Sequence, residues 1–152
     1  MASNARYITL KQRSGRVNGG IGAVAAPIAV VHNDPKLQEL ITFTLRAAGH
    51  HTAGFEDPAT ALEALEGDPR VRVLVTRMNF GSGKLNGVAL ARMLRLKRPG
   101  LKTVFVGLPE NAEHAERVGE FLPLPLNPEH LAHLVASLLV EPSPIYSLTD
   151  AF

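Results

Sequence analysis

The chain has 152 residues, of which 45% are hydrophobic and 20% charged, a composition that fits one globular domain and argues against global disorder. It contains no cysteine, which excludes disulfides, thiolate nucleophiles and cysteine-bound zinc and fits a reducing, cytoplasmic address. The formal net charge of +2 is too small to indicate a nucleic-acid partner, and no apolar run approaches the ~20 residues that span a bilayer.

Residues 1–26 form a basic leader that carries no acidic residue. Its four positive charges come from Arg6, Lys11, Arg13 and Arg16, and several glycines follow them. A transit peptide or an anion-binding arm has this composition, but so does a flexible, solvated leader, which is the interpretation that we favour. The folded domain is expected to span residues 27–140.

Short apolar runs alternate with helical patterns along this domain. Strands are expected at residues 28–31, 52–55, 71–76, 103–106 and 121–124. Helices are expected after Asp34-Pro35, after Asp57-Pro58, after the glycine-containing loop 77–87, at 110–119, and from Pro128 onward. This alternation predicts right-handed crossovers, a parallel sheet and helices on both its faces. Working sites of such sheets lie beyond the carboxyl ends of the strands.

Residues 141–152 are expected to be an extended arm, because Pro142 and Pro144 stop the last helix. The arm would expose apolar side chains if it were free, namely Ile145, Tyr146, Leu148 and Phe152. We expect it to dock on a second copy and to give a symmetric homodimer. Packing back on its own domain is the alternative.

Over residues 27–140 the chain resembles the CheY-like receiver domains of two-component response regulators. An apolar strand runs into His32-Asn33-Asp34-Pro35, and other residues fall where receivers usually carry such types: Gly49, Ala61, Leu62, Gly87, Pro99 and Pro125. The resemblance implies an α/β, flavodoxin-like (βα)5 fold with five parallel strands in the order 2-1-3-4-5.

The positions that carry the chemistry of receivers hold other residues here. Receivers bind magnesium through two acidic residues after the first strand, where this chain has His32 and Asn33, and Asp34 is the one carboxylate nearby. Arg77 replaces the phosphoacceptor aspartate and cannot form an acyl phosphate. Gly107 replaces the hydroxyl residue, and Leu124 replaces the lysine. The chain therefore looks like a pseudo-receiver, with no enzymatic activity, metal or cofactor expected.

Further expectations concern the vacated site and the signalling face. We expect Arg77 to point into the site and to pair with Asp34, because a guanidinium can replace the metal as the local positive charge. Phe121 lies where receivers often have a switching aromatic, although we favour a ring held against the core. The stretch 107–124 is shorter than usual, which should truncate the fourth helix.

Three motifs allow a functional and a structural interpretation. His32 could ligate a metal or accept phosphate, but we favour a polar residue at a strand end. The loop Gly81-Ser82-Gly83-Lys84 is similar to a phosphate-binding loop yet lacks its upstream glycine and its final hydroxyl, so a flexible recognition loop is expected. The third helix is basic and is interpreted as a solvated face, with charges at Arg92, Arg95, Lys97 and Arg98.

The function expected from the resemblance is phosphorylation-independent signalling by protein–protein interaction in a bacterial two-component pathway. The partner would be a sensor histidine kinase or another signalling protein. The alternative is a flavodoxin-like protein or enzyme that binds a small ligand or a nucleotide, because a fold alone does not fix function. Neither a membrane nor a nucleic acid is expected as a partner.

Overall fold

A computed structural model describes residues 27–140 of the protein. The expectations for the leader, residues 1–26, and for the arm, residues 141–152, lie outside the described residues, as do the arm residues Ile145, Tyr146, Leu148 and Phe152. No helix within the described part of the chain is both long and apolar enough to cross a membrane.

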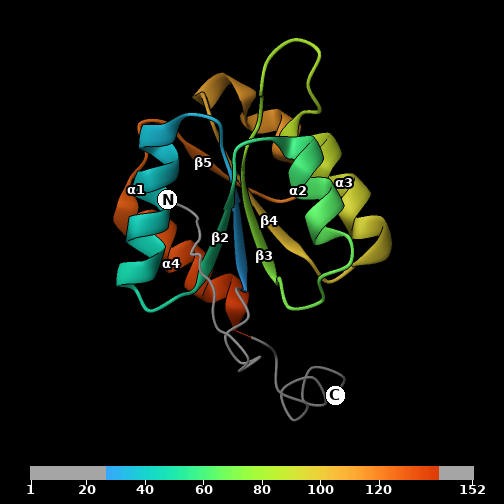
Figure 1. Ribbon diagram of the computed structural model, residues 1–152. Coiled ribbons are helices and arrows are strands. Elements are labelled where there is room, and N and C mark those ends of the chain that lie inside the picture. Colours follow the sequence, from blue (N-terminus) through green and yellow to red (C-terminus); the bar gives the residue numbers. More distant parts are fainter. Residues whose placement is uncertain (1–26, 141–152) are drawn as a thin grey trace, which may run out of the picture.

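Five parallel strands form one sheet at the centre of the domain (Figure 1). They are β1 (Ile28–Val31), β2 (Thr52–Phe55), β3 (Val73–Arg77), β4 (Lys102–Gly107) and β5 (Glu120–Pro123). Their order in the sheet is β2-β1-β3-β4-β5, which confirms the predicted flavodoxin-like (βα)5 arrangement. The third strand begins two residues later than expected and includes Arg77.

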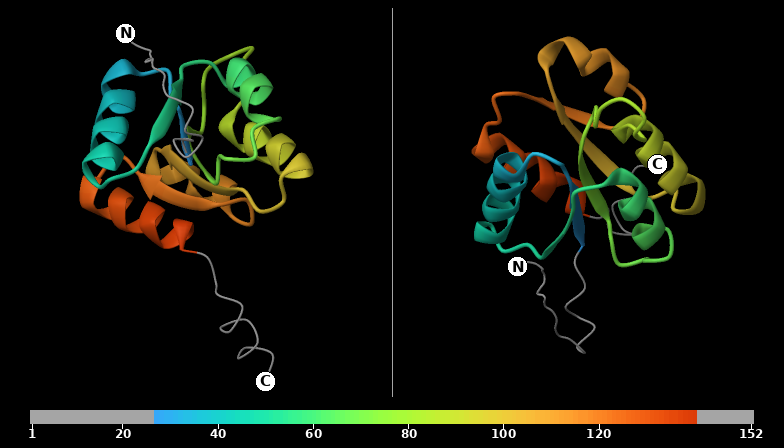
Figure 2. Two further views of the ribbon diagram at one scale, coloured as in Figure 1. Left: turned by 60° about the horizontal axis from the view of Figure 1, so that its bottom comes forward. Right: turned by 45° about the horizontal axis from the view of Figure 1, so that its top comes forward.

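Helices cover both faces of the sheet. The helices α1 (Pro35–Ala47) and α4 (Pro128–Leu139) lie on one face, and α2 (Pro58–Leu65) and α3 (Gly87–Lys97) on the other (Figures 1 and 2). The expected helix at residues 110–119 is instead a short 3-10 segment, η2 (Pro109–Ala115). The segment does not continue to residue 119, because Arg117 has a left-handed backbone, with φ 70°, that no α-helix contains. Gly119 then lies so close to Thr103 that a Cβ would crowd its carbonyl oxygen.

The helices begin where the sequence predicts. Asp34, Asp57 and Asn127 each precede a proline, and each side chain accepts a hydrogen bond from a backbone N–H of the first turn. Proline lacks the N–H that would otherwise be unpaired there, and the cap satisfies one or two of the remaining N–H groups. Each of these three helix starts is therefore fixed by the capping residue that directly precedes its proline.

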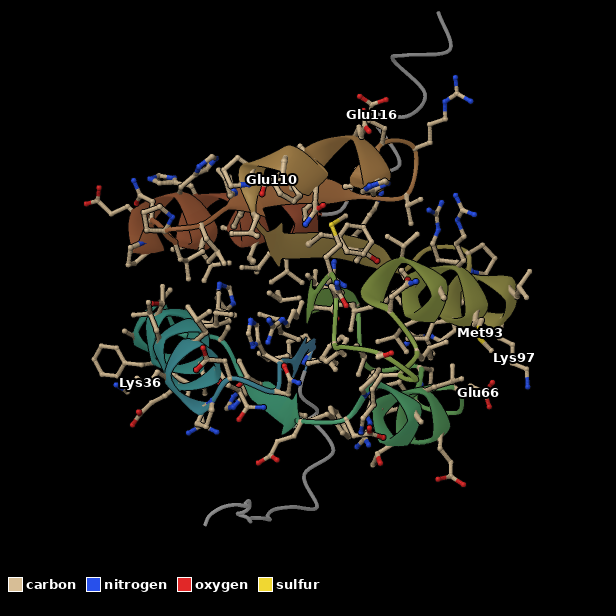
Figure 3. All side chains as sticks on the ribbon, turned by 90° about the horizontal axis from the view of Figure 1, so that it is seen from above. Lys36, Glu66, Met93, Lys97, Glu110 and Glu116 are labelled. Atoms are coloured by element: carbon tan, nitrogen blue, oxygen red, sulfur yellow. The ribbon has the colours of Figure 1, made fainter. Side chains whose placement is uncertain are left out.

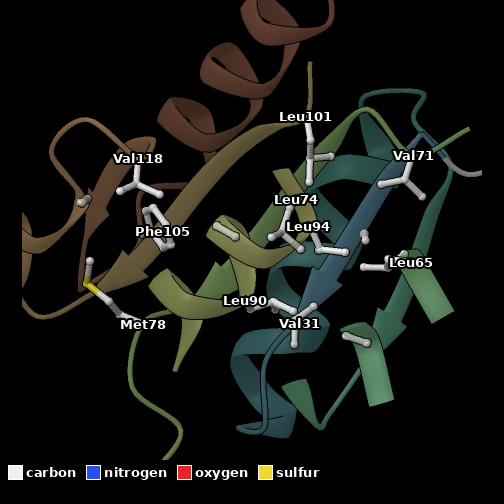
Figure 4. Packing of buried hydrophobic residues seen from close by; sticks show 14 of the residues in the cluster. Val31, Leu65, Val71, Leu74, Met78, Leu90, Leu94, Leu101, Phe105 and Val118 are labelled. Carbon is white, nitrogen blue, oxygen red and sulfur yellow. The ribbon is translucent and has the colours of Figure 1, made fainter. Parts of the chain in front are cut away.

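The core has two halves, one on each face of the sheet. Ala29 and Val31 point to the α2 and α3 side, whereas Ile28 and Val30 point to the α1 and α4 side. Phe105 is the largest fully buried side chain and lies in the first half, where Figure 4 shows Met78 at its margin. The strands are buried on both faces because they alternate side chains between two apolar layers.

Gly87 sets how closely the start of α3 approaches the end of β3. Its N–H donates to the carbonyl oxygen of Met78 over 2.9 Å. A Cβ at this position would overlap the carbonyl oxygen of Arg77, which is backbone and cannot rotate away. The close approach therefore requires glycine.

We predict that Gly87→Ala lowers the free energy of unfolding by about 2 kcal/mol or more, because the helix must move away from the strand. Gly100→Ala is the control, since a Cβ there has no neighbour within 4 Å. Its free energy of unfolding should stay within about 0.5 kcal/mol of the wild type in urea titrations. Equal losses in the two variants would show that Gly87 has no special role.

Candidate functional site

The carboxyl ends of the strands meet at one edge of the sheet, and Figure 3 looks onto this edge. Val31 lies beside Thr76 in the register of β1 and β3, and Arg77 lies beside Val106 in that of β3 and β4. The residues at and after these strand ends are therefore neighbours. They include the six residues that the resemblance assigns to the degenerate phosphorylation site, namely His32, Asn33, Asp34, Arg77, Gly107 and Leu124.

Arg77 joins the ends of β1 and β3. Its Nη1 donates a hydrogen bond to Oδ1 of Asn33 over 2.7 Å, and its side chain is half-buried. A guanidinium remains protonated in proteins, so the edge carries a permanent positive charge at this point. The structure thus brings together two of the residues that the sequence singled out.

The predicted ion pair between Arg77 and Asp34 is wrong. No ion pair joins these side chains in the described structure, and Oδ1 of Asp34 accepts the N–H groups of Lys36 at 3.0 Å and Leu37 at 3.4 Å. The reason is that a carboxylate at the helix N-cap is already used by the unpaired N–H groups of the first turn. Arg77 bonds to the amide oxygen of Asn33 instead.

His32 is a buried, neutral residue. Its side chain is 2% exposed, and its Nδ1 accepts a hydrogen bond from the backbone N–H of Asp34 over 3.0 Å. The pKa of His32 is lowered to about 4, mainly by burial and then by the nearby positive charge of Arg77, against a smaller opposing effect of Asp34. With Nδ1 occupied, this geometry favours a strand-end structural role, and residues 27–140 contain no cluster of three metal-ligating side chains.

Gly107 and Leu124 supply neither a hydroxyl nor an ammonium group at their own positions. A Cβ at Gly107 would lie 3.5 Å from Cβ of Met78 and 3.6 Å from Cε1 of Phe121, so these side chains occupy the space beside it. The ring of Phe121 is half-buried and packs against the core. Leu124 precedes a cis proline, Pro125, and its side chain packs against the other half of the core.

Two contacts at this edge were not predicted from the sequence. Lys84 forms an ion pair with Asp57 at 3.2 Å, which anchors the loop of residues 78–86 to the start of α2. The pKa of Asp57 is lowered, first by the hydrogen bond from the backbone N–H of Thr60 and then by Lys84. Gln38 donates through Nε2 to the carbonyl oxygen of Phe55 over 3.0 Å. Only tertiary structure brings these partners together.

The basic helix α3 is only partly the solvated face that the sequence suggested. Arg95 donates to the carbonyl oxygen of Val118 over 3.0 Å, and Arg98 donates to those of Pro69, at 3.2 Å, and Val71. These two arginines bind backbone carbonyls of neighbouring segments. Arg92 and Lys97 are exposed.

Comparisons by sequence find no matching protein-family model and no similar curated protein. Solved structures do match. The receiver domain of NtrX from Brucella abortus is 25% identical with a TM-score of 0.67, over 74% of this chain and 97% of that one. The chemotaxis response regulator CheY4 of Vibrio cholerae is 19% identical with a TM-score of 0.64, over 74% and 97%. The fold is that of a response-regulator receiver domain.

A third structure with the receiver fold is described as a redox sensor of the streptococci that evolved from two-component response regulators. It is 16% identical with a TM-score of 0.63, over 73% of this chain and 49% of that one. The carboxyl-end edge of the sheet is also where the sequence resemblance to receivers leads us to expect the phosphorylation site.

The buried neutral state of His32 predicts a pH dependence of stability. The unfolded chain binds a proton near pH 6.5 and the folded chain only near pH 4, so stability is lost as the pH falls through this window. For a pKa shift of this size, the free energy of unfolding should fall by at most about 3 kcal/mol.

We expect His32→Asn to flatten the free energy of unfolding between pH 6.5 and about 4, measured by urea titration at each pH. Asparagine offers a side-chain oxygen to the N–H of Asp34 but does not titrate. His51→Asn, at an exposed position, is the matched control and should keep the wild-type slope. A wild-type slope in His32→Asn would contradict the assignment.

Proposed function

We propose that the protein is a phosphorylation-independent receiver-like module that signals by binding another protein of a two-component pathway. The partner would be a sensor histidine kinase or another signalling protein. The observation that carries the proposal is the hydrogen bond from the guanidinium of Arg77 to Asn33, because the resemblance to receivers assigns Arg77 to the phosphoacceptor position. The receiver fold of the solved neighbours supports the pathway.

Phosphoryl transfer on this fold would need an acidic metal site, a nucleophilic carboxylate and groups that stabilise the transferred phosphoryl group. Asp34 has its carboxylate on the first turn of α1, and His32 has its Nδ1 on a backbone N–H. The charge of Arg77 does not change with a phosphodonor. Such a module would signal by binding to or leaving its partner protein, without a chemical step of its own.

We predict that neither acetyl phosphate with magnesium nor a kinase phosphorylates the protein, as measured by intact mass. Arg77→Asp alone should not gain efficient transfer, because Gly107 and Leu124 still supply no hydroxyl and no ammonium group. A phosphorylatable receiver treated in parallel is the positive control. A magnesium-dependent acyl phosphate on the wild-type protein would overturn the proposal.

Partner binding is tested by capture on the immobilised full chain from its own cell extract, with and without acetyl phosphate and magnesium. We expect a histidine kinase or a response regulator to be retained equally in both conditions. A thermal-shift screen with nucleotides, flavins and magnesium addresses the alternative, a ligand-binding flavodoxin-like protein. Stabilisation by a nucleotide or flavin, with no two-component protein captured, would favour that alternative.

We also propose a symmetric homodimer formed through the arm of residues 141–152. The proposal rests on the apolar side chains of the arm, Ile145, Tyr146, Leu148 and Phe152. Removing all residues after Val140 should convert the dimer to a monomer in light scattering. An unchanged oligomeric state would refute the arm-mediated dimer.

A further inference from the structure

A hollow of about 600 Å³ lies between the start of α3, the loop that precedes it, and η2. We call it the α3–η2 hollow. Its apolar wall consists of Met78, Val88 and Ala89, and its polar wall includes Arg92 of α3 and Asn111 and His114 of η2. The volume falls within the range of about 300 to 1,000 Å³ that is usual for small-molecule sites.

The polar wall has unused hydrogen-bonding capacity. Within residues 27–140, the side chains of Arg92, Asn111 and His114 make no hydrogen bond and no ion pair. Asn79 and Asn86 also line the hollow, and their oxygens accept the N–H groups of Gly81 and Ala89, at 2.9 and 2.8 Å. Their NH₂ groups remain available as donors, so donors predominate in the hollow.

No acidic residue lines the hollow. Arg92 places a permanent positive charge there, and an anionic oxygen beside it would form a charge-assisted hydrogen bond. An inorganic anion would use only the polar wall, whereas an organic anion would also cover Met78 and Val88. We propose that the α3–η2 hollow binds a small organic anion, with its charged group on Arg92 and His114 and its apolar part on Met78 and Val88.

Met78 connects the hollow with the candidate functional site. Its side chain lines the hollow and also lies 3.8 Å, at Sδ, from the Cβ that Gly107 would carry, where Phe121 packs as well. A bound anion would therefore press on the side chain that fills the space beside Gly107. If the protein is the phosphorylation-independent module proposed above, occupancy of the hollow would be its input, whereas the binding itself does not depend on that proposal.

Methionine methyl NMR tests the binding on the full chain. Met78 lines the hollow, whereas Met93 lies on the opposite flank of α3 with Lys97, toward Glu66 of α2 (Figure 3). The probes are phenyl phosphate and benzoate, with benzyl alcohol as the neutral analogue. We expect both anions to shift the Met78 methyl signal in a saturable way at concentrations up to about 10 mM, with Met93 unchanged and benzyl alcohol much weaker.

Arg92→Ala should weaken this binding by about tenfold or more, because it removes the charged partner of the anion. Lys97→Ala is the matched control, since it removes the same charge from the same helix but outside the hollow, and it should bind as the wild type does. Both side chains are exposed, so both variants should fold. A missing Met78 shift, an equal Met93 shift, or unchanged affinity in Arg92→Ala would each overturn the site, whatever the phosphodonor test gives.

Discussion

The parallel register of β1 and β3 determines which side chains meet at the carboxyl-end edge of the sheet. Val31 beside Thr76 brings the residue pair His32 and Asn33 to the end of β3, where Arg77 stands. The side chain at position 77 therefore lies at the end of β3, close to the first turn of α1. The close approach of Gly87 holds the other side of the edge, because it fixes where α3 begins relative to the same strand end. The other contacts at this edge depend on these two constraints, the strand register and the close approach at Gly87.

At this edge, the positive charge of Arg77 and the buried imidazole of His32 are compatible only if the imidazole stays neutral. His32 meets this condition through burial and through the hydrogen bond at Nδ1, and Arg77 adds to the cost of a second positive charge. Asn33 suits its position because a neutral amide oxygen accepts from the guanidinium. The three residues thus form one electrostatic unit whose net charge is constant near neutral pH.

Much of the fold could be predicted from local signals in the sequence. Apolar runs such as residues 28–31 mark strands that are buried on both faces, and Asp57-Pro58 marks a helix start, because these signals depend on neighbours in the chain. The partner of Arg77 was predicted wrongly, since Asn33 and Asp34 are adjacent in the sequence and the carboxylate of Asp34 is used by the helix cap. The role of Met78 was also hidden, because its neighbours Gly107 and Phe121 come from other strands. The α3–η2 hollow exists only where three separate segments meet.

The anchored loop between β3 and α3 also offers a practical way to observe the edge. The loop extends beyond the sheet (Figure 1), and Lys84 pairs with Asp57. Ser82 is exposed and lies in the sequence between Gly81 and Gly83, both with positive φ. The chain contains no cysteine. A single Ser82→Cys substitution would therefore accept one thiol-reactive fluorophore at a surface position where backbone and core are left intact. Its emission would report encounters at this edge in real time.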